Sequence, residues 1–213
     1  MRVDREFVFA AVADQRREMA CLLDGLDAAQ LATPSLCVGR DVKTVAAHVV
    51  STVTDGTPAF LRLALRRHSM ACAIDELARR QAQLPAAEIA DGLRRCADRR
   101  FSPPLFGPLD PLADVLVHGG DIRIPIGLPF RPDPQLAALA MDFLTGPWPF
   151  GFVPLRRLRG ISLHANDIRR TWGRGAEIRG PVAALMLAVS GRRALLHLLD
   201  GPGLPLLRHR LGS

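Results

Sequence analysis

The sequence predicts a mainly α-helical protein, in which an antiparallel helical bundle is followed by a small α+β unit. Up to about residue 145, apolar residues recur at helical spacing in long segments. Residues 146–154, rich in proline and glycine, then interrupt this pattern, and the residues after them alternate as in a strand. These observations predict two domains, a helical bundle at 1–145 and a small α+β domain at 146–213.

Apolar spacing and capping residues set the expected helices of the first domain. Asp41 has the place of an N-cap before one helix, and Asp110, followed by a proline, has that place before another. Pro58 falls inside the helix that Asp41 opens and is expected to kink or divide it. The expected helices cover residues 3–24, 41–67, 85–99, 110–124 and, as a shorter segment, 134–144.

In the second domain, short strands and glycine turns are expected before an apolar helix. Residues 159–165 alternate in part and predict a strand. A hairpin is expected next, formed by residues 168–172 and 176–179 around a Gly-Arg-Gly turn. The remaining elements are an apolar helix at 181–190 and a short helix at 194–199.

Composition excludes several classes of protein. A chain of 213 residues with 48% hydrophobic content can bury a sizeable core. No run of about eighteen residues is apolar and uncharged, and the N-terminus has no apolar signal region. The four cysteines are widely spaced and form no C-x-x-C pair. We therefore expect a cytoplasmic protein with no membrane span, disulfide framework or cysteine zinc site.

The positive charge of the chain raises one alternative, binding to nucleic acid. The net charge is +7, and Lys43 is the single lysine among 28 basic residues. The arginines occur as pairs spread along the chain, with no basic block interleaved with aromatic residues, and tyrosine is absent. Solvated helix faces explain this pattern better than a nucleic-acid interface, so we expect no nucleic-acid partner.

Three polar residues in apolar surroundings are the candidates for chemistry. Asp114 and His118 are four residues apart, a spacing that places both side chains on one face of a helix. His48 lies among small and β-branched apolar residues. Burying ionisable groups costs several kcal/mol unless something compensates, and a metal ion would do so. If they converge, two imidazoles and one carboxylate form a divalent-metal site with a position left for water or substrate.

Each of these residues also has an ordinary structural explanation. A single histidine on an apolar helix face is more often a partly buried residue than a ligand, and Asp and His pairs at this spacing are common surface contacts. Asp121, three residues after His118, could orient that imidazole by accepting its other N–H, or could be a residue of the helix end. The residues alone leave both explanations open.

Three segments resemble the mycothiol-dependent maleylpyruvate isomerase family, which belongs to the DinB-like four-helix metalloenzyme superfamily. They are residues 34–48 (PSLCVGRDVKTVAAH), 113–129 (ADVLVHGGDIRIPIGLP) and 167–192 (DIRRTWGRGAEIRGPVAALMLAVSGR). The resemblance touches nearly the whole chain. It implies a DinB-like antiparallel four-helix bundle followed by a small α+β C-terminal domain.

The resemblance also implies a metal, a thiol and site residues. In the family, the residues that match His48, Asp114 and His118 hold one divalent ion, usually zinc. Members that act as enzymes use mycothiol, a small bacterial thiol, whose thiolate adds to an activated small molecule. The thiol leaves again in isomerases and stays attached in transferases. Arg192 matches a catalytic arginine thought to face the active site, and its other explanation is a cation at a helix end.

The chain departs from the family pattern at three positions. The family often has tryptophan at Arg40, an acid at Thr44 and glutamate at Asp114. Because aspartate is one methylene shorter, the metal lies closer to that helix, is coordinated through water, or is absent. The alternatives to a thiol-dependent isomerase or transferase are therefore a non-catalytic binding or stress protein and a thiol-independent metal hydrolase. The substrate and the oligomeric state stay open.

Overall fold

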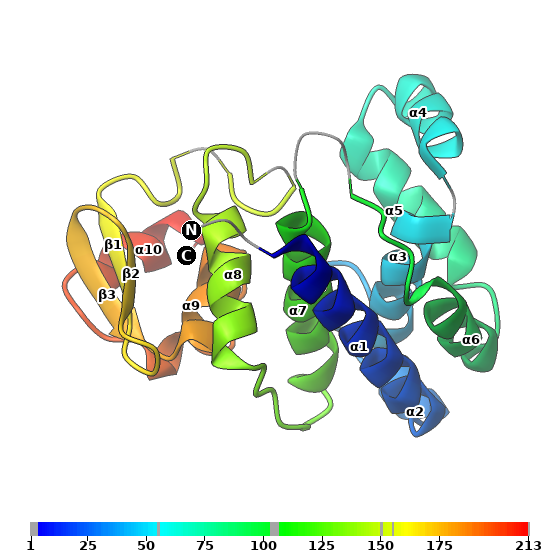
Figure 1. Ribbon diagram of the computed structural model, residues 1–213, viewed down its shortest axis with the longest axis horizontal. Helices are drawn as coiled ribbons and strands as arrows, with labels where there is room; N and C mark the ends of the chain where they lie inside the picture. The colour runs from blue at the N-terminus through cyan, green and yellow to red at the C-terminus, as the bar shows by residue number, and fades with distance from the viewer. Residues whose placement is uncertain (1–3, 55, 103–106, 150, 155, 213) are drawn as a thin grey trace. The chain divides into compact units, whose positions relative to one another are not determined.

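The computed structural model is mainly helical, with one three-stranded sheet, which confirms the expected fold class (Figure 1). It describes residues 4–54, 56–102, 107–149, 151–154 and 156–212. Two compact units can be distinguished, one formed by Met1–Phe101 with His118–Pro129 and the other by Ser102–Val117 with Phe130–Ser213. Among the described residues, no helix is both long and apolar enough to cross a membrane.

These units divide the chain elsewhere than at the expected boundary, residue 145. Helix α8 (Pro134–Leu144) packs against helix α9 (Val182–Val189), so it belongs to the second unit. The N-terminal part of helix α7 (Leu109–Arg123) belongs to the second unit as well, and its C-terminal part to the first. The division into domains 1–145 and 146–213 stays a prediction.

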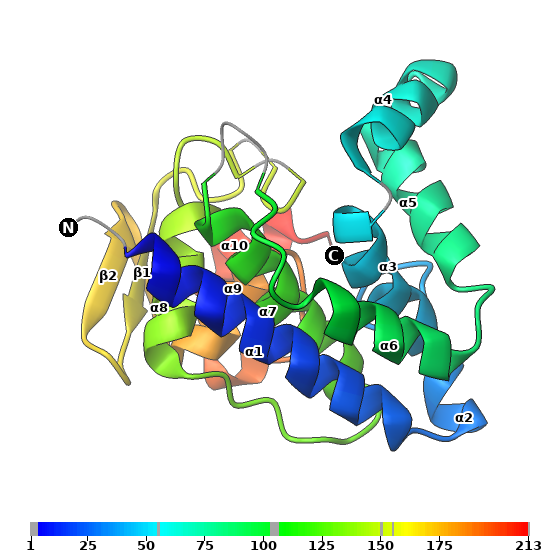
Figure 2. The same cartoon turned by 45° about the vertical axis from the view of Figure 1, so that its right-hand side comes forward.

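The first unit is helical, and its core is made of apolar helix faces. Helix α1 packs along α6, and α3 packs against both α5 and α6, as two views of the ribbon show (Figures 1 and 2). An ion pair between Arg123 and Glu18 ties the C-terminal part of α7 to α1. The helices of this unit are α1 (Arg5–Asp24), α2 (Ala28–Leu31), α3 (Val42–Thr54), α4 (Gly56–Arg67), α5 (Met70–Gln81) and α6 (Ala86–Cys96).

The helix expected at 41–67, with a kink or division at Pro58, is present as two helices, α3 and α4. Helix α3 ends at Thr54 and α4 begins at Gly56, with residue 55 outside the described part. Pro58 lies in the first turn of α4, where a proline costs no helical hydrogen bond. Helix α5 was not expected; Ser69 caps it by accepting a hydrogen bond from the backbone of its first turn.

A buried arginine accounts for the end of α6, which was expected near residue 99. Arg16 of α1 is 3% exposed. Its NH1 group donates to the carbonyl oxygens of Cys96 and Ala97, both at 3.2 Å, and of Arg99 at 3.1 Å. Carbonyls at a helix end have no partner within the helix, so the guanidinium satisfies them and the helix stops at Cys96.

In the second unit, an apolar helix packs on a small mixed sheet. Strands β1 (Ile161–Ala165), β2 (Arg170–Gly173) and β3 (Ala176–Gly180) lie in the order β2-β1-β3. Helix α9 contacts β1 and β3 as well as α8, and nearly all of its side chains are buried. An apolar surface all round is typical of a helix inside a core. A 3₁₀ turn, Leu196–Leu198, and helix α10 (Leu204–Arg210) follow.

The hairpin expected between residues 168–172 and 176–179 is wrong. Strand β2 pairs antiparallel with β1, whereas β3 pairs with the other edge of β1 in parallel. The two residues between β2 and β3 therefore carry the chain past the start of β1, from one edge of this strand to the other. At Gly173 a Cβ atom would lie 2.6 Å from the carbonyl oxygen of Ile161, and at Gly175 it would lie 2.1 Å from the backbone of Gly160. Glycine is required at both positions because the two backbones almost touch.

Candidate metal centre

Helix α3 carries His48 in a buried position. The helix starts after Asp41, whose Oδ1 accepts a hydrogen bond from the backbone N of Thr44 at 2.7 Å, so the expected N-cap at Asp41 is present. Most side chains of α3 are buried, because the helix packs against two neighbours. His48 itself is 6% exposed, so its imidazole is held inside the protein rather than in solvent.

Helix α7 carries the other two candidate residues. Asp114 and His118 are one helical turn apart and share one face, as their spacing predicts. His118 is buried and Asp114 half-buried. The helix begins at Leu109, so Asp110 lies within the first turn and is not the cap that the sequence predicts.

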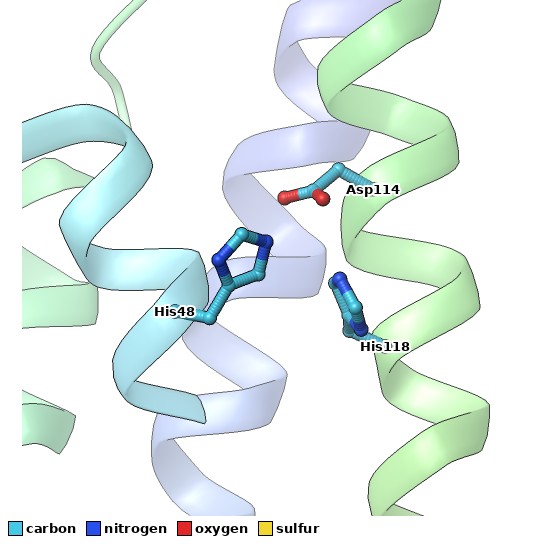
Figure 3. A group of neighbouring side chains, drawn as sticks. All are labelled: His48, Asp114 and His118. Atoms are coloured by element: carbon cyan, nitrogen blue, oxygen red, sulfur yellow. The ribbon is translucent and has the colours of Figure 1, made fainter. Parts of the chain in front are cut away.

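The three side chains converge. One ligand atom from each of His48, Asp114 and His118 can be chosen so that all lie within 4.8 Å of one another. The side chains point into one common space, His48 from α3 and the other two from α7 (Figure 3). The two imidazole rings meet edge to face, with their centroids 4.8 Å apart and their planes at 79°.

This arrangement fits a divalent metal. Zinc bonds of about 2.0–2.2 Å in a tetrahedral site place neighbouring ligand atoms about 3.3–3.6 Å apart. The spread of up to 4.8 Å in the structure is larger by about 1 Å, which small side-chain rotations can close. Two imidazoles and a carboxylate are a donor set that zinc and other divalent transition metals accept. Three protein ligands leave a tetrahedral ion one further position.

Asp121 lies where a carboxylate that orients a ligand should be. Its Oδ2 is 2.8 Å from Nδ1 of His118, and the residue is fully buried. With Nδ1–H donated to this carboxylate, the other ring nitrogen of His118, Nε2, is the one left for a metal. The backbone oxygen of Asp121 also accepts a hydrogen bond from the backbone N of Leu36, which joins the loop before α3 to α7.

Arg40 anchors this loop to α5. The side chain of Arg40 is 11% exposed, and its Nε lies 3.1 Å from Oδ1 of Asp75 on α5. Arg79, one turn further along α5, pairs with the same carboxylate and donates to the backbone oxygen of Gly39. Burial acts to raise the pKa of Asp75, but the hydrogen bonds from Arg79 and Arg40 outweigh it and hold the pKa below its usual value.

Arg192 follows the C-terminal end of α9. Its backbone N donates to the carbonyl oxygen of Leu187, and its guanidinium donates to that of Ser190. Both contacts are of the kind expected for a cation at a helix end. The catalytic role that the family resemblance gives to Arg192 stays a prediction.

The sequence analysis did not single out Asp110 as a site residue. It is half-buried, and it precedes Asp114 by the same four-residue step that separates Asp114 from His118. Burial, and after it the negative charge of Asp114, raise the pKa of the Asp110 carboxyl to about 7. The repeated spacing was visible in the sequence and could have found this residue.

Comparisons with known proteins agree with this fold. The sequence model of the family described as the mycothiol maleylpyruvate isomerase N-terminal domain matches residues 12–102. No curated protein matches the chain.

Two solved structures are similar over nearly the whole chain. One is the crystal structure of the mycothiol-dependent maleylpyruvate isomerase, with a TM-score of 0.64 and 14% sequence identity, covering 94% of this chain and 93% of that chain. The other is a histidine-to-alanine mutant of a mycothiol-dependent maleylpyruvate isomerase, with a TM-score of 0.60 and 13% identity over the same shares. The fold is therefore that of these isomerases, and residues 12–102 are similar in sequence to the N-terminal domain of the mycothiol maleylpyruvate isomerases.

Proposed function

We propose that this protein is a zinc-dependent enzyme that uses mycothiol as a co-substrate and acts on an activated small molecule by isomerisation or thiol transfer. One observation carries the proposal, the convergence of His48, Asp114 and His118 to within 4.8 Å. The matching family model and the two isomerase structures support the proposal, and mycothiol is named as the co-substrate because those proteins depend on it.

The site residues have distinct tasks in this proposal. When bound, a divalent ion lowers the pKa of a coordinated thiol and so supplies a thiolate nucleophile near neutral pH. His48, Asp114 and His118 hold the ion, and Asp121 fixes the ring of His118 so that Nε2 faces it. We assign to Arg192 the binding of a negatively charged group of the substrate, because a guanidinium pairs well with a carboxylate.

Elemental analysis of the purified protein, followed by a thermal-shift measurement, tests this function. We expect about one zinc ion per chain and a melting temperature that rises with mycothiol concentration but not with glutathione. A ligand that binds the native state alone stabilises it in proportion to RT ln(1 + [L]/Kd). Thiol consumption during turnover then separates the two reaction types, because a transferase consumes mycothiol and an isomerase returns it.

The alternatives appear as other outcomes of the same experiment. A metal-free protein with no response to mycothiol would point to a binding or stress protein that has kept only the bundle. Bound metal without a response to mycothiol would point to a thiol-independent hydrolase. We also propose a cytoplasmic location and no nucleic-acid partner, which fit a small-molecule enzyme and the scattered arginines of the chain.

A further inference from the structure

The second unit contains a cavity of about 390 Å³ that has no task in the function proposed above. The end of α8 and strands β1 and β2 form part of its wall, and the segment between α8 and β1 forms the rest (Figure 1). The lining is mainly apolar and includes Leu144 of α8, Leu163 of β1 and three prolines, Pro147, Pro149 and Pro154. A mainly apolar cavity of this volume is typical of a binding site for a small molecule.

Trp172 of β2 gives this cavity a fixed aromatic wall. Its Nε1–H donates to Oδ1 of Asp142 at 2.7 Å, and the guanidinium of Arg170 lies over its ring, 5.2 Å from the centroid. Arg170 also forms an ion pair with Asp142, so the three side chains hold one another in place. Because the indole has no polar group besides this N–H, the surface that Trp172 offers to a ligand is apolar. The prolines add to a rigid wall, since their rings have little freedom to move.

Two arginines, Arg156 and Arg159, bring positive charge to the cavity, and both are exposed. Within the described part of the chain, neither side chain makes a hydrogen bond or an ion pair. None of the described residues that line the cavity is acidic, so its wall offers these guanidinium groups no partner of opposite charge. A guanidinium binds a carboxylate through two parallel hydrogen bonds, which makes this side of the cavity suitable for an anion.

The loop that carries both arginines is tied to the rest of the unit. Nη1 of Arg210 in α10 donates to the carbonyl oxygens of Arg157 at 2.8 Å and of Arg159 at 2.6 Å. Nη1 of Arg157 in turn donates to the carbonyl oxygen of Val189, at the end of α9, at 3.0 Å. A backbone that is already held in place loses less conformational entropy when a ligand binds. The fold therefore presents Arg156 and Arg159 at the cavity before any ligand arrives.

We propose that this cavity binds a small aromatic carboxylate, with its ring against Trp172 and its carboxylate on Arg156 and Arg159. A rigid apolar wall favours a rigid apolar ligand, and aromatic rings pack well against an indole. A sugar or another polar body would lose its hydrogen bonds to water here without gaining enough new ones. The inference does not rest on the proposed thiol chemistry, because none of the lining residues belongs to the proposed metal centre.

NMR titration of the isotope-labelled full chain with benzoate tests the inference. The chain has two tryptophans, so the variant Trp148→Phe identifies the indole N–H signal of Trp172. An aromatic ring bound against Trp172 shifts this signal, and we expect the shift to saturate as benzoate is added. Benzamide has the same ring without the charge and should bind about 10-fold more weakly, because it loses the charge-assisted hydrogen bonds. Cyclohexanecarboxylate keeps the charge on a ring that is not flat and should also bind more weakly.

Three variants show whether the arginines recognise the carboxylate. Arg156→Gln and Arg159→Gln should each weaken benzoate binding by about 5-fold, the upper end for an exposed ion pair. Both side chains are exposed, so neither change should affect folding. As a control, Arg208→Gln removes an exposed arginine of α10 that does not line the cavity, and it should bind benzoate as the wild type does.

The outcomes that would overturn the inference are distinct. If the Trp172 signal shows no saturable shift, the cavity does not bind an aromatic acid. Equal binding of benzoate and benzamide, or unchanged binding in both Arg156→Gln and Arg159→Gln, would show that the arginines do not recognise the carboxylate. Equal binding of cyclohexanecarboxylate would overturn the aromatic class of the ligand. The proposed function is unaffected by all of these results, because zinc content and the response to mycothiol are measured separately.

Discussion

The carboxylate of Asp121 and the imidazole of His118 form a buried pair, with 2.8 Å between Oδ2 and Nδ1. The pair lies within one turn of α7, so the helix itself supplies both the proposed ligand and the group that orients it. Carboxylate–histidine pairs of this kind fix the tautomer and the ring orientation of a ligating histidine, and make it more basic.

Asp121→Asn should therefore weaken the metal without removing a ligand. We expect metal affinity to fall by about 10–100-fold, because an amide orients the His118 ring less firmly and leaves it less basic. Competition with a chromogenic chelator measures this affinity. Asp14→Asn removes an exposed carboxylate and should leave it unchanged. Equal affinities in the two variants would show that the buried pair does not tune the metal.

His118→Ala should abolish stoichiometric metal binding. With His48 and Asp114 alone, two protein ligands remain, too few for a stable zinc site. Elemental analysis after dialysis against metal-free buffer is the measurement. His209→Ala removes an exposed histidine of α10 and should keep full occupancy. Full occupancy in His118→Ala would refute the assignment of this ligand.

How much of this site the sequence predicts depends on the distance along the chain. The four-residue spacing of Asp114 and His118 is a local pattern, and helix geometry alone places them together. His48 lies 66 residues before Asp114, so its approach depends on how α3 and α7 pack, which spacing does not encode. In the sequence analysis, only the family resemblance predicted that His48 lies next to Asp114 and His118.

For the fold too, the sequence predicts the features that depend on nearby residues and misses those that depend on distant ones. Most helices were predicted, because apolar periodicity and capping residues act within a few residues. The end of α6 was not predicted, because it depends on a hydrogen bond from Arg16, about 80 residues earlier in the chain. The order of the strands was not predicted either, because it depends on the pairing of β3 with β1. A Gly-Arg-Gly segment between two strand-like runs is typical of a hairpin turn. Here the two runs, β2 and β3, do not pair with each other, because each pairs with a different edge of β1.

Arg16→Met should destabilise the protein by about 3 kcal/mol. The change leaves the carbonyl groups of Ala97 and Arg99 without their donor, whereas that of Cys96 keeps a hydrogen bond from the backbone N of Arg99, and buried unsatisfied acceptors cost roughly 1–3 kcal/mol each, reduced where water can reach them. Urea unfolding measures the loss. As a control, Arg17→Met breaks the exposed ion pair between Arg17 and Asp98, and it should cost less than about 1 kcal/mol. Similar losses in both variants would contradict a capping role for Arg16.

Gly175→Ala should damage the sheet more than a positive φ alone explains. Its Cβ would lie 2.1 Å from backbone atoms of Gly160, which cannot rotate away. We expect a loss of more than about 3 kcal/mol in urea unfolding. Gly127→Ala, also at a positive φ but with nothing near its Cβ, should lose only about 1 kcal/mol. A loss as small as that of Gly127→Ala would show that the segment between β2 and β3 does not pass so close to Gly160, the residue before β1.

Asp110 should make the metal-free protein less stable as the pH rises. Its pKa is about 7 in the folded protein and near 3.8 when unfolded, so between these values the folded state binds one more proton. Stability therefore falls with increasing pH, by about 1.4 kcal/mol for each pH unit, and stops falling above pH 7. From pH 5 to pH 8, wild type should lose about 2–3 kcal/mol relative to Asp110→Asn, which has no proton to lose. Urea unfolding of both proteins in chelator across this range is the measurement, and a constant difference between them would mean that solvent reaches the carboxyl freely.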